Sequence, residues 1–237
     1  MQWIVLAAWS LLMVICIHWD FFRFYRMAMA AGLIASMGMQ LALLWMDDML
    51  TLETALPLHL CGLFGVLSVP LLFHPSAPLW ELSAFLAAPA AACTLFFPAV
   101  IRCSHPGMMT YAFSQLHALI ALVPVFLWLN GKPLPWNTRR AFILGSGYLL
   151  FVWAFNSAFG TNYLFLRAAP SGTPLEWLLN RGTVFYVCSL SVLCMTVFSC
   201  LQGVFCRLNQ RLFTAGNSSS CSRYSRCIPP WSSPNRG

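Results

Sequence analysis

The stretch 27–46, MAMAAGLIASMGMQLALLWM, decides the fold, because it contains no charged side chain. A membrane-spanning helix needs about 20 mostly apolar residues to cross the hydrocarbon core of a bilayer, and this run has that length. Arg23 and Arg26 precede the run, and Asp47 and Asp48 end it. The sequence therefore predicts a membrane-spanning helix over these residues.

The same pattern recurs along the chain. Hydrophobic residues make up 59% of the 237 residues and charged residues only 8%, whereas a soluble domain carries about 25% charged residues. We expect Pro57 to lie in the first turn of its span, where a missing amide donor costs little, and Pro89 to kink the next span. The chain is thus expected to be all-α, a polytopic transmembrane bundle of about seven spans near 2–17, 27–46, 56–73, 80–101, 111–129, 141–159 and 183–206.

The distribution of basic residues predicts the orientation of the bundle. With the N-terminus outside, ten of the 13 Lys and Arg residues fall on the inner side, and Arg102, Arg167 and Arg181 fall outside. Cytoplasmic loops are enriched in Lys and Arg, so an N-out, C-in orientation is expected. We expect residues 1–212 to form the transmembrane helical domain, and residues 213–237 a disordered, basic cytoplasmic tail.

Composition and spacing also exclude several functions. The net charge of +7 lies in short clusters beside apolar runs, whereas a nucleic-acid-binding protein needs a basic face on a folded domain. Most of the ten cysteines fall within or beside apolar runs, without any CxxC spacing, so they are expected to be small buried hydrophobes. No nucleotide-binding or metal motif occurs. We therefore expect membrane lipids as partners, no nucleic acid and no cofactor or metal; the sequence does not indicate an oligomeric state.

A histidine and a thiol near the start of the third span are the first candidate site. His59 and Cys61 are two residues apart, so on a helix they point about 200° apart and cannot pair. A partner for Cys61 must come from another helix, and His117 in the fifth span is the candidate. An imidazole that takes the thiol proton would allow the thiolate to attack an ester or thioester carbonyl.

Small residues surround this thiol on the helix. Cys61, Gly65 and Ser68 share one helix face, which would let a neighbouring backbone or an acyl chain approach closely. The alternative is structural, with Cys61 as a packing residue and His117 bonded to a backbone carbonyl or to Asn156. The other polar groups inside spans, Gln40 and Gln115, are expected to be helix–helix contacts.

The stretch 156–166, NSAFGTNYLFL, crosses the end of the sixth span. Gly160 suggests a helix end, because glycine accepts the left-handed conformation that closes helices. Asn162 and Tyr163 then lie at the depth of the lipid headgroups, where amide and aromatic groups are favourable. Two interpretations stay open: a rim that binds headgroups, or a capped helix with an aromatic anchor.

Three motifs together resemble a known family. LPLHLCG at 56–62, FSQLH at 113–117 and NSAFGTNYLFLRAAP at 156–170 are similar to motifs of the YwaF-like integral membrane proteins of bacteria, over about 56–186. The resemblance implies a multi-pass protein of the cytoplasmic (inner) membrane. Related eukaryotic transmembrane proteins are acyltransferases on ether phospholipids that use a membrane-embedded cysteine.

The resemblance also implies roles for individual residues. It makes the chain a candidate phospholipid acyltransferase or acyl hydrolase. Cys61 matches the nucleophile, and His117 is the expected base. We assign His59, Asn156, Asn162 and Tyr163, which lie in the same motifs, to substrate binding.

Two other functions compete with an enzyme. A small transporter or channel would line a polar path with His59, Gln115, His117 and Asn156. Against this, no span is expected to bury an Asp, Glu, Lys or Arg, which ion-coupled carriers often use, and no inverted repeat is evident. The third hypothesis is a non-catalytic membrane scaffold.

Overall fold

The computed structural model describes residues 1–98, 100–132, 134–135, 138–169 and 174–214, and the prediction of a disordered tail falls almost wholly outside them. Helices without a single strand account for the regular structure of these residues, which confirms the all-α prediction. The elements are α1 (Gln2–His18), α2 (Phe22–Met46), α3 (Leu52–Ala55), α4 (Leu60–Phe73), α5 (Ala77–Leu82), the π-turn η1 (Ser83–Ala87), α6 (Ala88–Phe96), α7 (Pro106–Leu129), α8 (Thr138–Phe159), the 3-10 turn η2 (Tyr163–Phe165), α9 (Pro174–Leu179) and α10 (Thr183–Thr214).

The described residues contain six helical segments long and apolar enough to cross a membrane, plus the shorter apolar α1. At 17 residues, α1 rises about 25 Å, so about seven passes agree with the helices observed. The six are Phe22–Met46, Leu52–Phe73, Ala77–Phe96, Pro106–Leu129, Thr138–Phe159 and Phe185–Asn209. The N-out, C-in orientation stays a prediction.

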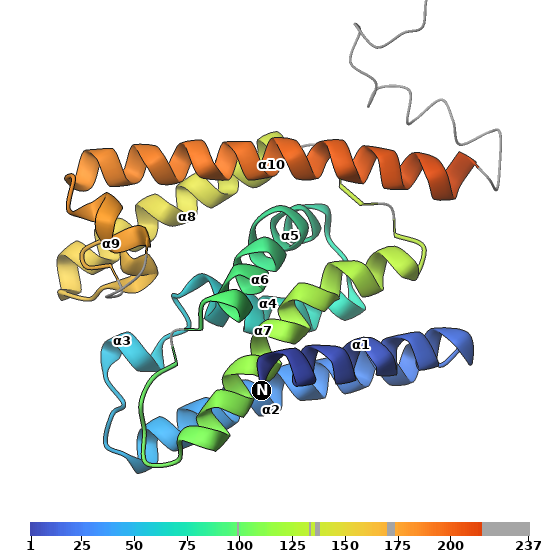
Figure 1. Ribbon diagram of the computed structural model, residues 1–237, viewed down its shortest axis with the longest axis horizontal. Helices are drawn as coiled ribbons and strands as arrows, with labels where there is room; N and C mark the ends of the chain where they lie inside the picture. The colour runs from blue at the N-terminus through green and yellow to red at the C-terminus, as the bar shows by residue number, and fades with distance from the viewer. Residues whose placement is uncertain (99, 133, 136–137, 170–173, 215–237) are drawn as a thin grey trace, which may run out of the picture.

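Helix α7 lies at the centre of the bundle. It contacts α1, α2, α4 and α6, while α8 and α10 lie together along the edge opposite α1 and α2 (Figure 1). Over an 18-residue apolar stretch of each span, 72% of the residues in α7 are buried inside the protein, but only 6% of those in α10. A bilayer would therefore cover the apolar surface of α8 and α10, together with the apolar side chains that α1 and α2 expose.

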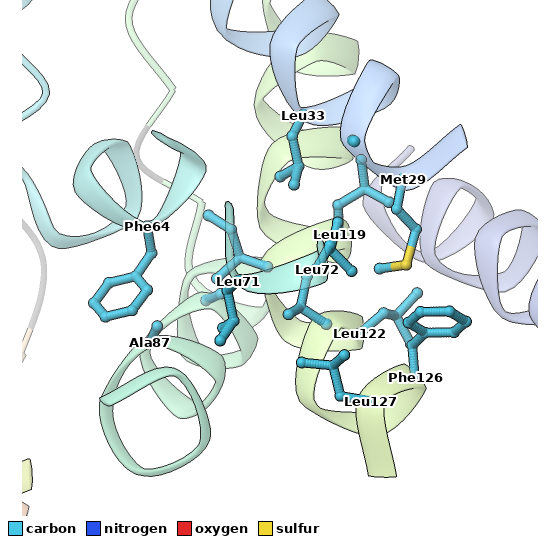
Figure 2. Packing of buried hydrophobic residues seen from close by; sticks show 14 of the residues in the cluster. Met29, Leu33, Phe64, Leu71, Leu72, Ala87, Leu119, Leu122, Phe126 and Leu127 are labelled. Carbon is cyan, nitrogen blue, oxygen red and sulfur yellow. The ribbon is translucent and has the colours of Figure 1, made fainter. Parts of the chain in front are cut away.

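The main core joins α2, α4, η1 and α7. Figure 2 shows how side chains from these four elements meet, and each is at most 7% exposed. Lipid tails are as apolar as leucine, so close packing, and not release of water, holds helices together in a membrane. The side chains labelled there are Met29, Leu33, Phe64, Leu71, Leu72, Ala87, Leu119, Leu122, Phe126 and Leu127.

Glycines bring α2 and α4 close to α7. A Cβ atom on Gly32 would lie 2.8 Å from Leu119 Cδ1 and 3.0 Å from the Trp9 ring. A Cβ atom on Gly65 would lie 2.6 Å from Met37 Sδ and 3.0 Å from Leu116 Cδ1. Small residues at such positions let membrane helices approach closely, which increases their dispersion contacts.

Two prolines shape the third and fourth spans. Pro89 has no N–H, so it cannot continue the regular helical bonding of the preceding turn. The chain adopts the π-turn η1 directly before it, with the Ala88 N–H donating to the Ser83 carbonyl, while a kink at Pro89 stays a prediction. The placement of Pro57 was wrong: it lies between α3 and α4, not in the first turn of a helix. Leu56 before it is extended (φ −85°, ψ 137°), as the steric clash with a following proline favours.

The expectation that no span buries a charged side chain is wrong for Glu81. This residue lies in the span Ala77–Phe96 and is 8% exposed. Its Oε2 atom is 3.6 Å from Arg140 Nε, which joins α5 to α8. The pair is tolerated because Glu81 is near the end of its span, and because the long Arg140 side chain is 49% exposed and can keep its charged head near water.

Asp47, the acidic residue that caps the C-terminal end of α2, also has a structural role. Asp47 accepts hydrogen bonds from Ser104, at 2.6 Å from the backbone N–H and 2.5 Å from the hydroxyl. These bonds stabilise the carboxylate and hold the pKa of Asp47 below its usual range. Asp47 thereby fixes the loop before α7 to the end of α2.

A pair of matched substitutions in α2 tests the close packing against α7. Gly32→Val should lower the free energy of unfolding by about 1–3 kcal/mol, the usual cost of overpacking, because Leu119 and Trp9 must move. Gly38→Val is the control, since nothing lies within 4 Å of a Cβ at that position and the change in helix propensity is the same. Thermal unfolding of both variants in detergent micelles provides the measurement; equal losses would contradict close packing at Gly32.

Candidate functional site

Two segments that are distant in sequence meet at one end of the bundle: the segment that enters α4 and the loop that follows α8. His59 is the N-cap residue of α4, and its ring centroid lies 5.1 Å from that of Tyr163 and 5.3 Å from that of Phe165. The Tyr163 hydroxyl donates to the Leu52 carbonyl. The structure thus brings His59 and Tyr163 together, two residues from Cys61.

Tyrosine hydroxyls hold these segments in place. Besides Tyr163, the Tyr148 hydroxyl donates to the Leu58 carbonyl at 2.6 Å. Tyr163 is fully buried, and this burial raises the pKa of its phenol. The phenol therefore stays a hydrogen-bond donor at physiological pH.

Asn156 organises the loop that carries Tyr163. It is 1% exposed, and its Nδ2 donates to the Tyr163 carbonyl at 2.8 Å. Its Oδ1 accepts from the Tyr163 N–H at 2.9 Å and from the Thr161 hydroxyl at 2.8 Å. Gly160 ends α8 with φ +70°, which confirms the predicted left-handed helix end.

Asn162 folds the next part of the same loop. Its Oδ1 accepts from the N–H groups of Arg167 and Ala168, at 2.9 and 3.0 Å, and its Nδ2 donates to the Ala168 carbonyl at 2.7 Å. In this structure the polar atoms of Asn156 and Asn162 therefore bond to the loop itself. Substrate binding by His59, Asn156, Asn162 and Tyr163 stays a prediction.

Cys61 lies in the first turn of α4 and is half-buried. Thr94 on α6 is within hydrogen-bonding range of its side chain. On the same face of α4, Gly65 contacts α7 closely, and Ser68 is fully buried with no hydrogen-bond partner among the described residues. The face predicted to be lined by small residues thus points into the bundle.

His117 is buried in the middle of α7, at 4% exposure. Its Nδ1 is 2.7 Å from the Phe113 carbonyl oxygen, and its ring packs on Phe113 with 4.1 Å between centroids. A bond to a carbonyl requires an N–H at Nδ1, so the neutral imidazole keeps its lone pair at Nε2. This tautomer is the one that a general base needs, although the bond to a carbonyl is equally the structural alternative.

Cys61 and His117 do not share a hydrogen bond in the part of the chain that the structure describes. Cys61 lies within hydrogen-bonding range of Thr94, whereas His117 bonds to the Phe113 carbonyl. The contact of Gly65 with Leu116 nevertheless brings α4 against α7 one turn from Cys61 and one residue from His117. The two residues belong to packed helices, but a direct pair stays a prediction.

The two glutamines differ from each other. Gln115 donates from Nε2 to the Gly32 carbonyl at 3.1 Å, which confirms a contact between α7 and α2. Gln40 instead donates to the Ser36 carbonyl of its own helix at 3.4 Å. The expected helix–helix contact is thus confirmed for Gln115 and stays a prediction for Gln40.

An apolar cavity of about 330 Å³ lies between η1–α6, α7 and α10, and sequence reasoning missed it. Its lining consists of Ala, Pro, Val, Leu, Phe and Trp side chains. Ala84, Ala88 and Ala92 line it at four-residue spacing, a pattern that is visible in the sequence. Ala121 and Pro124 line it from α7, four and seven residues after His117, and therefore continue the helix face on which His117 lies.

The described residues contain no group of three or more His, Cys, Asp or Glu side chains that could hold a metal ion.

Removing the Asn156 side chain tests its role in the loop. Asn156→Ala leaves the Tyr163 carbonyl and amide without their partners, and each buried unsatisfied group costs about 1–3 kcal/mol. We expect a lower thermal unfolding temperature and faster proteolysis of the loop 160–168. Ser157→Ala is the neighbouring control, because the exposed Ser157 hydroxyl bonds only to the Trp153 carbonyl. Similar behaviour of the two variants would contradict this role of Asn156.

Comparison with known proteins identifies the family of the chain but no individual similar protein. Neither a curated protein nor a solved structure matches the chain. Residues 1–202 match the profile of the TMEM164 family, a span that includes α1 to α9 and most of α10. With its apolar helices and this match over most of its length, the chain is a multi-pass membrane protein that belongs to the TMEM164 family.

Proposed function

We propose that the chain is a membrane-embedded acyl-transfer or lipid-hydrolysing enzyme, with Cys61 as nucleophile and His117 as base. The observation that carries this proposal is the state of His117. Its buried imidazole is fixed through Nδ1, has a free lone pair at Nε2, and lies on the face of α7 that continues into the apolar cavity. A base one helical turn from the lining of an apolar cavity suits a reaction on a lipid ester.

The proposed reaction balances without a cofactor. His117 Nε2 takes the Cys61 thiol proton, and the thiolate attacks the ester carbonyl of a donor lipid. The carbon–oxygen bond to the donor glycerol breaks, and His117 returns the proton to the departing oxygen, which leaves a thioester on Cys61. The hydroxyl of an acceptor lipid then attacks this thioester, His117 takes its proton, and the regained thiolate is reprotonated. Water as acceptor gives hydrolysis instead.

Formation of the Cys61–His117 contact is part of the proposal. Catalytic hydrogen bonds are often long or absent without substrate and form in the reacting complex. Exchange of the Thr94 hydroxyl for the His117 imidazole as the partner of Cys61 would complete the pair. His59 and Tyr163, which pack together near Cys61, would hold the substrate with Asn156 and Asn162 behind them.

The apolar cavity supplies a place for an acyl chain. Its volume of about 330 Å³ lies in the usual range of ligand pockets, about 300–1,000 Å³. It is bounded by small side chains on η1 and α6 and by the aromatic rings of Trp128 and Phe205. A chain bound there would extend from His117 along α7.

The membrane in which the protein lies and its orientation there are part of the same proposal. The similarity of the three motifs to YwaF-like proteins suggests a bacterial cytoplasmic membrane. With the N-terminus outside, the start of α4, and with it Cys61, would lie toward the outer face.

A small transporter is the second candidate function. The buried Glu81, paired with Arg140 inside a span, is a group that carriers use. However, Gln115 bonds to α2, and His117 two residues later points about 200° away on the same helix. The polar residues therefore do not form one path.

Substitution of the two proposed catalytic residues tests the enzyme. Cys61→Ala should abolish labelling of the protein by a long-chain acyl electrophile, because the acceptor thiol is lost. His117→Ala should slow labelling about 10²–10⁴-fold, the usual contribution of a general base. Labelling of the full chain in membranes, with lipid profiling of the same cells, is the measurement.

Cys93→Ala is the matched control, because Cys93 is a free cysteine exposed on α6. Wild-type labelling in Cys61→Ala at preserved protein levels would overturn the proposal. Unchanged lipids in all variants would favour a transporter or scaffold.

A second test addresses the acyl chain. Ala88→Phe fills the cavity, so we expect a shift of labelling toward probes with shorter acyl chains. Cys93→Phe adds the same ring to the same helix outside the cavity and should leave the chain-length preference unchanged. The ratio of labelling rates for short and long probes is the measurement, and equal ratios in both variants would rule out the cavity as the chain site.

A further inference from the structure

A second cavity, shallow and open to the surface, has a volume of about 430 Å³ and lies at the end of α8, lined by the exposed Trp153, Ser157 and Arg167 and the buried Leu166. Unlike the cavity beside α7, it contains a cationic side chain. None of its lining residues has a role in the reaction proposed above. It therefore needs a separate explanation.

Arg167 is held in position from two directions. Its backbone N–H donates to Asn162 Oδ1 at 2.9 Å, and its Nη1 donates to the Asn156 carbonyl at 3.3 Å. A Cβ atom on Gly160 would lie 4.0 Å from Nη1, so the guanidinium lies against the open end of α8. The loop built by the two asparagines thus positions a cation.

The guanidinium keeps unused hydrogen-bonding capacity. Arginine has five N–H donors, and one of them bonds to the Asn156 carbonyl. Within the described ranges, the ion pair that the structure shows joins Arg140 to Glu81, and no carboxylate pairs with Arg167. The remaining donors form a fork that matches the geometry of a phosphate group.

The surroundings of the cavity indicate a lipid source for that phosphate. The surface of α8 exposes Leu150 (67%), Phe151 (53%) and Phe159 (60%), a surface for the bilayer. Trp153 is 58% exposed at the side of the cavity, and tryptophan rings favour the headgroup region. The cation therefore lies at the end of a lipid-facing span, where phospholipid phosphates are concentrated.

We propose that this cavity binds the phosphate of a phospholipid headgroup, with Arg167 as its cationic ligand. Trp153 lies beside the headgroup, and the small Ser157 leaves the space that the headgroup occupies. The site binds an intact lipid and does not depend on acyl transfer.

The test measures lipid binding by the full chain in detergent micelles, in a Cys61→Ala background that removes the proposed reaction. The micelles contain phosphatidylglycerol, or diacylglycerol with the same acyl chains, or no lipid with inorganic phosphate in the buffer. Bound lipid is counted by native mass spectrometry, and phosphate binding is followed by thermal stabilisation. The variants are Arg167→Gln, Arg167→Lys and Ser157→Phe, with Arg181→Gln as control, because Arg181 stacks on Trp177 at 4.6 Å outside the cavity.

We expect phosphatidylglycerol to bind, and to bind about tenfold more weakly to Arg167→Gln, as the loss of one charge-assisted contact predicts. Arg167→Lys should keep part of the binding, and Arg181→Gln all of it. Ser157→Phe fills the cavity without touching the Arg167 bonds, so its loss of binding supports the site even if Arg167→Gln does not fold. Unchanged binding in both Arg167→Gln and Ser157→Phe, equal binding of diacylglycerol, or stabilisation by inorganic phosphate alone would each overturn the proposal.

Discussion

The absence of water from the hydrocarbon core is the constraint on which the structure depends, because each polar group there needs a partner within the protein. The helices satisfy the backbone, and several hydroxyl groups inside spans bond back to their own helix, as Ser36 does to Gly32 and Thr94 to Ala90. Among the described residues, the buried hydroxyls of Ser68 and Ser83 are exceptions without a partner. Asn156 serves the same need where α8 ends, since it supplies partners to both backbone groups of Tyr163. For the buried carboxylate of Glu81, the partner within the protein is the Arg140 side chain.

Packing around α7 follows from the same constraint. Without release of water as a driving force between helices, association depends on dispersion contacts and therefore on how closely helices approach. Gly32 and Gly65 let α2 and α4 approach α7, which leaves α7 mostly buried while α8 and α10 remain exposed. His117 is buried because it is carried by the central helix. Its bond to the Phe113 carbonyl is the local consequence, and it also fixes the tautomer on which a base function would rest.

The sequence is most informative where one physical requirement dominates. Apolar length predicts the helices and most of their C-terminal ends, and Gly160 predicts the end of α8 correctly. The expected ends at residues 101 and 206 were wrong, because α6 ends at Phe96 and α10 continues to Thr214. The break at Pro57 was placed wrongly because a capping box at Thr51 and Thr54 forms the separate helix α3, which spacing alone does not reveal. Glu81 was missed because its partner comes from α8. The apolar cavity beside α7 and the position of Arg167 likewise depend on which helices become neighbours, and a single sequence does not specify these contacts.

A phospholipid is polar at one end and apolar at the other, so a site for it needs polar groups at headgroup depth and an apolar volume further into the membrane. The chain has features of both kinds. Arg167 and the loop built by Asn156 and Asn162 lie beyond the end of α8, and the cavity beside α7 lies along the helix face that continues from His117. Cys61 lies in the first turn of α4, directly after His59 and Leu60, and the His59 ring packs against Tyr163 of the polar loop. In the proposed reaction, the polar loop, Cys61 and the cavity beside α7 would meet the headgroup, the ester and the acyl chain of one lipid in that order, whereas Arg167 would bind the phosphate of a separate, intact lipid.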